Sequence, residues 1–172
     1  KVVVASKKLY VNRDEGFIGT TMRKDEYVCD CSDIDDIMVF RKDGAMQVVK
    51  VDNKIFVGKD IIHCAVFKKK DERTIYNMIY KDGKSKITLM KRFSVTSITR
   101  GKEYKLTKSD KGSKVLYFTA NPNGEAETVT VNLRKLQKLK ILRIDVNFAD
   151  LTIKGKGAGG NIVTKNPVRT VE

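Results

Sequence analysis

The sequence predicts an all-β fold of about four propeller-like blades, each with about four strands. Many short β-branched runs, two prolines and twelve glycines argue against a helical protein. Residues 128–133 alternate strictly, so that Val129, Val131 and Leu133 share one face of a strand. A hairpin signal recurs at a period of about 40 residues, which is typical of propeller blades. One domain is expected to fill residues 1–172.

Glycine-containing turn signals separate the predicted strands. Residues 41–44, 80–83 and 121–124 each end in glycine, where a tight hairpin requires a positive φ angle. A strand-like run precedes each turn, and residues 9–16 form a shorter copy at the start of the chain. The final glycines of the four copies lie 28, 39 and 41 residues apart, and a further 36 residues reach Gly160. Four such copies predict four hairpins, one for each blade.

One leucine-rich stretch allows a second interpretation. Leu133, Leu136, Leu139 and Leu142 recur at every third residue, as the side chains of a helical turn do. The stretch is rich in lysine and arginine, lacks a clear cap and lies between strong strands. We therefore expect it to be extended.

The charge balance predicts a polyanionic partner. The chain carries 35 Lys and Arg residues against 21 Asp and Glu, a net charge of +14. This excess costs self-repulsion in the compact state, and nucleic acid is the obvious compensating partner. The alternative is a solvated basic surface that serves solubility. No apolar run approaches the ~20 residues that span a bilayer, so no membrane partner is expected.

The cysteines and the first residues bear on the compartment. Cys29, Cys31 and Cys64 are odd in number and no export signal is apparent, which favours a reducing cytoplasm. A zinc site with His63 is conceivable, but the Cys-x-Cys spacing is unusual for zinc, so buried reduced thiols are expected. Residues 1–5 lack a signal-peptide core and an initiator Met, and we interpret them as a strand that begins a fragment of a longer protein.

An aromatic-rich strand that ends in Asp-Gly and is followed by a Val/Lys-rich strand resembles the repeat in the C-terminal domains of gyrase and topoisomerase IV A subunits. The resemblance rests on residues 15–19 (EGFIG), 35–44 (DDIMVFRKDG) and 154–161 (KGKGAGGN). It spans essentially the whole chain, and the order and spacing of these phrases are more specific than any one of them. It implies a β-pinwheel, a propeller-like disc whose blades exchange strands and whose rim bends duplex DNA.

The same resemblance favours topoisomerase IV over gyrase. Gyrases carry a Gln-Arg-Arg-Gly-Gly-Lys-Gly-type box between the first blade's Gly-Tyr-Ile-like phrase and the next hairpin. Here that interval, residues 20–31, reads TTMRKDEYVCDC and contains no such box. The glycine-rich residues 154–161 lie near the other end and lack the Gln-Arg-Arg start. A divergent gyrase without the box remains the alternative.

The resemblance implies that catalysis lies outside this chain. Enzymes of this family cut DNA with a tyrosine and Mg²⁺ in another part of the parent chain, so no catalytic residue, metal site or cofactor is expected here. The parent enzyme is expected to use Mg²⁺ and ATP through other domains or subunits. Tyr76, Tyr80, Tyr104 and Tyr117 lie in strand-like runs and are expected in the core or in cross-strand pairs. His63 lies in an apolar run, which favours a structural role over that of a general base.

Two further patterns have a catalytic and a structural interpretation. Asp33, Asp35 and Asp36 could hold Mg²⁺ as in a nuclease, but aspartates before an element favour a polar turn ahead of the strand at Ile37. Residues 155–160 are glycine-rich like a phosphate loop but lack the Gly-Lys-Ser/Thr ending, so nucleotide hydrolysis is not expected. Glycine would still allow close approach to a DNA backbone.

Phosphate binding by distributed cations is the function that remains. Most basic clusters fall at hairpin ends or between repeats, where a disc presents its rim, although a solvated face is as good an explanation of any single cluster. The candidate DNA-binding residues are Lys7, Lys8, Arg13, Arg23, Lys24, Arg41, Lys42, Lys91, Arg92, Arg100, Lys102, Lys105, Lys154, Lys156, Lys165 and Arg169.

The resulting hypothesis is a non-catalytic domain that binds and bends double-stranded DNA and presents a segment for strand passage. Backbone contacts carry no sequence code, so weak specificity is expected. The partners expected through the rest of the parent chain are the topoisomerase B subunit and a second copy of the A subunit. The expected location is the bacterial nucleoid in the cytoplasm. The rivals are a propeller-like protein-interaction module, which would tolerate salt, and a small metal-dependent nuclease.

Overall fold

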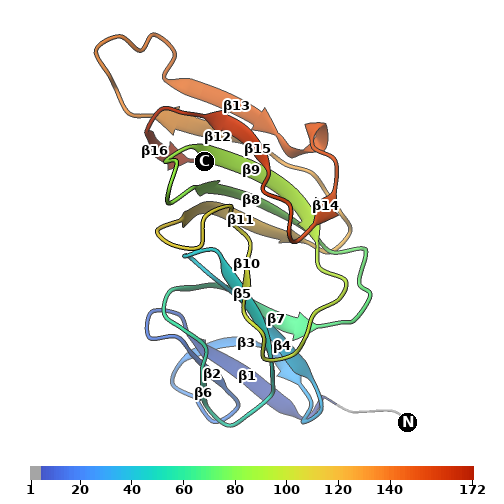
Figure 1. Cartoon of the computed structure of the whole chain (residues 1–172). Helices are drawn as coiled ribbons and strands as arrows, with labels where there is room; N and C mark the ends of the chain where they lie inside the picture. Colours follow the sequence, from blue (N-terminus) through green and yellow to red (C-terminus); the bar gives the residue numbers. More distant parts are fainter. Residues whose placement is uncertain (1–4) are drawn as a thin grey trace. The chain divides into compact units, whose positions relative to one another are not determined.

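The computed structural model describes residues 5–172, and nearly all of its regular structure is β-strand (Figure 1). Sixteen strands and one 3₁₀ helix, η1 (Phe148–Asp150), are present among the described residues, which confirms the all-β prediction. The strand expected at residues 1–5 falls, apart from Ala5, outside the described residues. No helix in the described part is long and apolar enough to cross a membrane.

The residues divide into two compact units, and each contains two sheets. The first unit consists of the chain up to Lys69 together with Ser97–Tyr104. The second consists of Lys70–Thr96 and Lys105–Glu172. Four sheets match the predicted number of blades, but their strand counts are four, four, five and three rather than four throughout.

The first sheet is built on the hairpin at the start of the chain. β1 (Lys7–Asn12) pairs with β2 (Phe17–Gly19) on one side and β3 (Glu26–Cys31) on the other. Gly16 in the hairpin turn has a φ of +85°, and a Cβ there would lie 2.1 Å from the backbone oxygen of Gly58. β6 (Ile55–Phe56) pairs with β2 at the edge. A later segment of the chain thus completes the first sheet.

The second sheet has the order β10-β5-β4-β7. β4 (Asp36–Arg41) and β5 (Ala45–Lys50) form the hairpin predicted around Gly44, whose φ of +86° confirms the turn geometry. β7 (Ile61–Phe67) pairs with β4, and β10 (Tyr104–Lys105) lies at the opposite edge. Buried residues of the first two sheets form one core that includes Leu9, Val11, Ile18, Ile37 and Val39.

The third sheet is the largest. β8 (Ile75–Lys81) and β9 (Thr88–Ser94) form its central hairpin, and β11 (Lys114–Asn121) pairs with β8. At the other edge, β14 (Lys154–Gly155) runs parallel to β9, and β15 (Asn161–Thr164) then runs antiparallel to the same strand. The glycine-rich loop between β14 and β15 is therefore the point where the chain reverses along β9.

The fourth sheet has three strands in the order β13-β12-β16. β12 (Thr128–Leu133) has the bounds predicted from its alternation, and Val129, Val131 and Leu133 are buried as expected. β13 (Arg143–Asn147) and β16 (Val168–Val171) flank it. The three buried residues of β12 join Ile79, Met90 and Phe148 in one core shared by the third and fourth sheets.

The prediction of a fourth hairpin around Gly124 is wrong. Gly124 does have a positive φ, +75°, but β11 pairs with β8 and β12 pairs with β13 and β16. The turn therefore leads the chain from the third sheet to the fourth. The leucine-rich stretch is likewise neither a helix nor an extended strand, because residues 134–142 form the loop between β12 and β13.

The turn after β8 is a hairpin, but glycine plays a different part in it from the one predicted. Gly83 has no positive φ; Lys86 does, at 63°. A Cβ on Gly83 would lie 1.9 Å from the backbone oxygen of Lys111, so glycine is needed there for close approach. The Asp82 carboxylate organises the turn by accepting hydrogen bonds from the backbone N–H and hydroxyl of both Ser85 and Ser109 (2.8–3.0 Å).

We expect Asp82→Asn to lower the free energy of unfolding by about 2 kcal/mol at neutral pH, because hydrogen bonds to a buried charge are lost. Burial raises the pKa of a carboxyl, but the bonds from Ser85 and Ser109 outweigh it and lower the pKa of Asp82 to about 2. The native state therefore favours the carboxylate, and this stability is lost as the pH falls from about 4 through about 2. Urea unfolding between pH 7 and pH 2 measures it, with exposed Asp110→Asn as the control. Equal losses in both variants would contradict the assigned role.

Candidate nucleic-acid interface

An open cationic cleft of about 560 Å³ lies on the first sheet. β1 contributes Lys7 and Lys8, and the segment after β2 contributes Thr20, Thr21 and Arg23; no carboxylate lines the cleft among the described residues. Lys7 forms an ion pair with Asp33 (2.6 Å), and this hydrogen-bonded contact raises the pKa of Lys7. Lys8 and Arg23 are exposed and have no carboxylate partner in the described part. The cleft can thus take an anionic group of an extended ligand such as a phosphate backbone.

Two candidate arginines of the first unit already have carboxylate partners. The guanidinium of Arg13 donates two hydrogen bonds to Glu26 (both 3.0 Å) and one to the Ile62 carbonyl (2.9 Å). The hydrogen bonds between Arg13 and Glu26 raise the pKa of Arg13 and lower that of Glu26. Arg100 forms a single ion pair with Asp36 (3.2 Å). These arginines must share or exchange a partner before they bind a phosphate.

Arg41 is held by two carboxylates and a backbone carbonyl of the first unit. Its guanidinium contacts Asp43 (3.0 Å) and Glu103, and it donates a hydrogen bond to the Val57 carbonyl (2.9 Å). It also packs against Gly58, where a Cβ would lie 2.5 Å from a guanidinium nitrogen. Arg41 therefore links three segments of its own unit.

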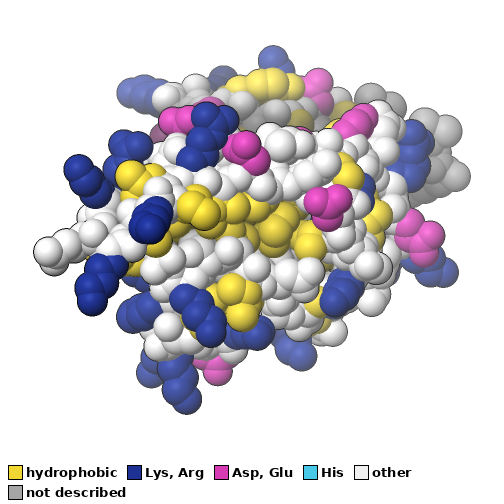
Figure 2. Space-filling model, turned by 90° about the horizontal axis from the view of Figure 1, so that it is seen from above, with side chains coloured by type: hydrophobic (Ala, Val, Ile, Leu, Met, Phe, Trp, Pro, Cys, Tyr) yellow, Lys and Arg dark blue, Asp and Glu magenta, His cyan; other side chains and the backbone are white. Residues whose placement is uncertain are grey.

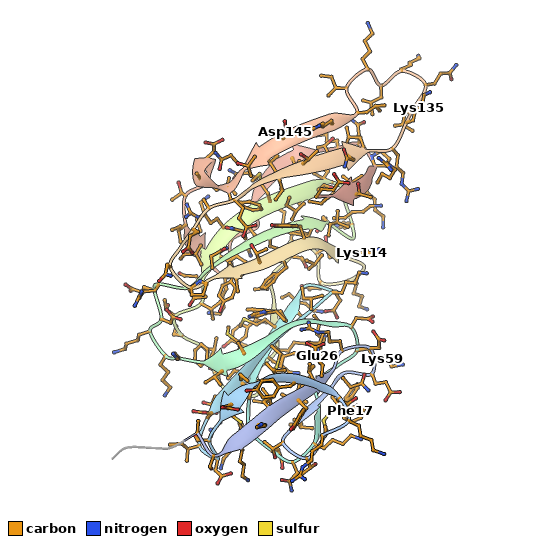
Figure 3. All side chains as sticks on the ribbon, turned by 180° about the vertical axis from the view of Figure 1, so that it is seen from behind. Phe17, Glu26, Lys59, Lys114, Lys135 and Asp145 are labelled. Atoms are coloured by element: carbon orange, nitrogen blue, oxygen red, sulfur yellow. The ribbon has the colours of Figure 1, made fainter. Side chains whose placement is uncertain are left out.

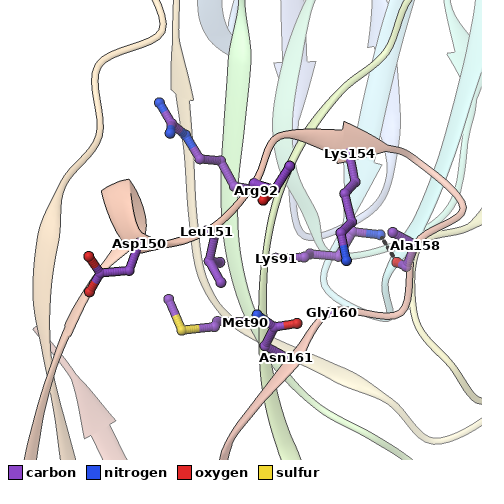
Figure 4. Close-up of a pocket in the computed structure, with 10 residues that line it drawn as sticks. Met90, Lys91, Arg92, Asp150, Leu151, Lys154, Ala158, Gly160 and Asn161 are labelled. Carbon is purple, nitrogen blue, oxygen red and sulfur yellow. Dashed lines mark hydrogen bonds between the residues drawn. The ribbon is translucent and has the colours of Figure 1, made fainter.

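Lys91 holds the glycine-rich loop of the second unit in place. Its side chain is buried, and its ammonium donates to the carbonyls of Leu106 (2.8 Å), Lys156 (2.9 Å) and Ala158 (2.7 Å); Figure 4 shows the last of these. Burial lowers the pKa of Lys91 to about 8. Because carbonyls already take its three N–H bonds, this ammonium has none left for a phosphate in this conformation. Sequence reasoning grouped Lys91 with the DNA contacts, whereas the structure places it inside the unit.

The neighbouring residues complete the support of this loop. The Tyr80 hydroxyl donates to the Gly159 carbonyl and accepts the Lys108 N–H (3.2 Å). Arg92 is half-buried and donates to the carbonyl of Gly124 (2.8 Å), which lies between β11 and β12 and not in this loop. A small pocket of about 80 Å³ lies beside the loop and is lined in part by Arg92 and Lys154 (Figure 4). Hydrogen bonds from Tyr80 and Lys91 therefore hold the glycine-rich loop in place.

The remaining candidate cations differ in exposure. Lys105 and Lys156 are half-buried. In Figure 2, Lys and Arg side chains project around the face in view and outnumber Asp and Glu. Eight candidates are exposed and pair with no carboxylate of the described residues, namely Lys8, Arg23, Lys24, Lys42 and Lys102 in the first unit and Lys154, Lys165 and Arg169 in the second.

Sequence reasoning missed a further cationic segment, the loop between β12 and β13. It contains Arg134, Lys135, Lys138 and Lys140, all of them exposed, and Figure 3 shows Lys135 on this loop. No Asp or Glu occurs between residues 128 and 144. The excess of basic residues in this loop is visible in the sequence. The leucine repeat, however, led to an interpretation of its secondary structure only.

His63 and Asp35, which were considered for catalysis, have structural roles. His63 stacks on Phe40 with ring centres 5.7 Å apart, and burial, with a smaller effect of Arg13, lowers its pKa to about 4. The predicted polar turn before β4 is confirmed by Asp35, whose carboxylate accepts the Ser32 N–H (2.8 Å). Within residues 5–172, no three His, Cys, Asp or Glu side chains are arranged to hold a metal ion.

Two of the three cysteines are buried as predicted, whereas Cys29 is only half-buried, and the predicted core tyrosines include Tyr76 and Tyr80. All three cysteines are free, and Cys31 and Cys64 are buried. Burial raises the pKa of Cys64 to about 12, which keeps it a thiol at neutral pH. Tyr76 and Tyr80 lie in the core of the second unit, and burial raises the pKa of both.

Comparison with known proteins assigns the family. A family model described as Topoisomerase C-terminal domain, Bacteroidota, matches residues 8–172. The A subunit of DNA topoisomerase 4 from Borreliella burgdorferi is 24% identical over 173 residues, which cover 100% of this chain and 26% of that protein. The chain thus spans about a quarter of the length of this relative. It belongs to the family of topoisomerase C-terminal domains, as its resemblance to the C-terminal domains of type IIA topoisomerase A subunits had indicated.

Proposed function

We propose that this chain binds double-stranded DNA without sequence preference and bends it, as the C-terminal domain of a type IIA topoisomerase A subunit. The observation that carries the proposal is the set of eight exposed candidate cations that have no carboxylate partner in the described residues. Each can neutralise a phosphate and release a counterion, which is the main source of non-specific DNA affinity. Contacts to phosphates fix orientation but read no bases.

Bending follows if these cations lie along a convex surface. Smooth bending of a 20–30 bp site by 40–90° costs on the order of 1–6 kcal/mol, and additional phosphate contacts offset this cost. A β-pinwheel would provide such a rim, and the completion of the first sheet by β6 supports the strand exchange that this architecture requires. The bent segment would be presented for strand passage. Cleavage, Mg²⁺ and ATP would belong to other parts of the parent enzyme.

Within this family we favour topoisomerase IV over gyrase. Residues 20–31 contain no gyrase-type box, and the relative from Borreliella burgdorferi is part of a DNA topoisomerase 4. A decatenation assay with the parent enzyme, with and without this domain, tests the proposed role. Loss of decatenation with DNA cleavage retained would support it, and unchanged decatenation and substrate preference would contradict it.

A charge-removal experiment on the isolated chain tests the proposed interface. Lys8, Arg23 and Lys24 are replaced together by glutamine, and the matched control replaces exposed Lys84, Lys111 and Lys114, which removes the same charge. If the first set contacts phosphates, the slope of log K against log salt should fall by about 3, because each lost contact contributes about 0.9.

Ring closure of a duplex of about 150 bp by DNA ligase, with and without each variant, measures bending in the same samples, since this length is close to the persistence length. The first triple variant should lose most of the acceleration that the wild-type chain gives, and the control should keep it. Equal effects of the two triple variants would contradict the proposed site. Absence of duplex binding by the wild-type chain at very low ionic strength would contradict the proposed function itself.

A further inference from the structure

The loop between β12 and β13, residues 134–142, has a defined backbone. The Leu133 N–H donates to the Leu142 carbonyl (2.8 Å) and closes the base of the loop, and the Leu139 N–H donates to the Leu136 carbonyl (3.0 Å) near its tip. The Arg134 N–H donates to the Pro167 carbonyl (2.9 Å) and ties the loop to the segment before β16. These bonds give the loop a preferred shape, which lowers the entropy lost on binding.

The apolar side chains of this loop differ in burial. Leu139 packs against the core shared by the third and fourth sheets. Leu136, Ile141 and Leu142 remain 44%, 67% and 38% exposed, respectively. Three large apolar side chains are thus exposed within nine residues, and a local concentration of exposed apolar side chains is a candidate binding site.

The charge around these apolar side chains defines the partner. Arg134, Lys135, Lys138 and Lys140 are exposed, and none pairs with a carboxylate of the described chain. Because residues 128–144 contain no Asp or Glu, a polyanion can approach the loop without like-charge repulsion. Leucine and isoleucine flanked by lysine and arginine are what DNA-bending proteins insert between base steps from the minor groove.

We propose that this loop is a wedge that enters the minor groove of duplex DNA. Ile141 lies against the edges of two adjacent base pairs and partly unstacks them, while Lys135, Lys138 and Lys140 contact the flanking phosphates. The inference rests on the proposed function and specifies one point at which the duplex is kinked. A wedge of this kind bends DNA by roughly 20–90°.

The test uses a duplex with 2-aminopurine, whose fluorescence rises on unstacking, and the whole 172-residue chain. Ile141→Ser is compared with Ile34→Ser, because these isoleucines are 67% and 66% exposed. The wild-type chain and Ile34→Ser are expected to raise the fluorescence at saturation. Ile141→Ser is expected to lose most of the rise and to bind roughly tenfold more weakly, since an isoleucine no longer leaves water on binding.

A second variant separates the wedge from its cationic flanks. Replacing Lys135, Lys138 and Lys140 by glutamine is expected to lower the salt slope by about 3 but to preserve the fluorescence rise at saturation. Circular dichroism verifies that each variant is folded. Duplex binding by the wild type with identical fluorescence for Ile141→Ser and Ile34→Ser would overturn the wedge and leave the proposed function standing. No duplex binding by the wild type at low ionic strength would overturn both.

Discussion

Raising the salt concentration from 50 mM to 200 mM is expected to weaken duplex binding by this chain by about 10³–10⁵-fold. That range corresponds to 6–10 phosphate contacts, and the eight exposed candidate cations without a carboxylate partner fall within it. Fluorescence anisotropy of a labelled linear duplex, titrated at several salt concentrations, measures the effect. These eight contacts, at about 0.9 each, are expected to contribute about −7 to the slope of log K against log salt, and the proposed contacts of Lys135, Lys138 and Lys140 would make the slope steeper by about 3.

The ion-paired cations provide an internal check on this result. Arg13 and Arg41 already contact carboxylates within the first unit, so their replacement by glutamine should change the slope less than the replacement of Lys8 or Arg23. Mixed-sequence duplexes should give similar slopes, because phosphate contacts read no bases. Affinity that hardly changes with salt would contradict the proposal and favour the protein-interaction module, whose binding rests on apolar contacts.

Phe148→Ala is expected to lower the free energy of unfolding by about 3–5 kcal/mol, because it opens a cavity in a packed core. Phe148 is fully buried, stacks on Tyr117 of β11 with ring centres 6.1 Å apart, and belongs to the core shared by the third and fourth sheets. Urea unfolding followed by circular dichroism measures the change. The loss should appear in the transition that reports the second unit.

Phe56→Ala is the matched control for this prediction. Phe56 is 58% exposed, and most of its surface stays in contact with water in the folded chain. Its replacement should cost about 1 kcal/mol or less, which is usual for a surface position. If Phe148→Ala were as mild as Phe56→Ala, the third and fourth sheets would not share the core that the structure describes.

Local patterns predicted the elements that depend on neighbours in the chain. The alternation in residues 128–133 predicted both the bounds of β12 and its buried face, because side chains on a strand alternate between two faces. The glycines at positions 44 and 124 predicted positive φ angles, since a glycine has no Cβ to oppose them. His63 in its apolar run was likewise correctly expected to be structural.

Local patterns failed where the partner of a segment is distant in sequence. The turn at Gly124 looks like the other hairpin turns, but β11 pairs with β8. Turn chemistry specifies backbone angles, whereas strand pairing is decided by which faces can be buried together. Gly83 shows the same limit, because the close approach of the Lys111 carbonyl, not a positive φ, requires glycine there.

The candidate interface divides in the same way. Composition established a basic chain, strand and turn patterns predicted an all-β fold, and the phrases at residues 15–19, 35–44 and 154–161 gave a family resemblance that the comparisons confirmed. The sequence could not separate Lys91 from exposed cations, because a charge gives no indication of the face on which it lies. The burial of Lys91 against the glycine-rich loop, with three carbonyls from two separate segments around one ammonium, depends on how β14 and β15 pair with β9. The folded chain therefore determines which cations remain free for a polyanion, since ion pairs and burial arise from residues brought together only by folding.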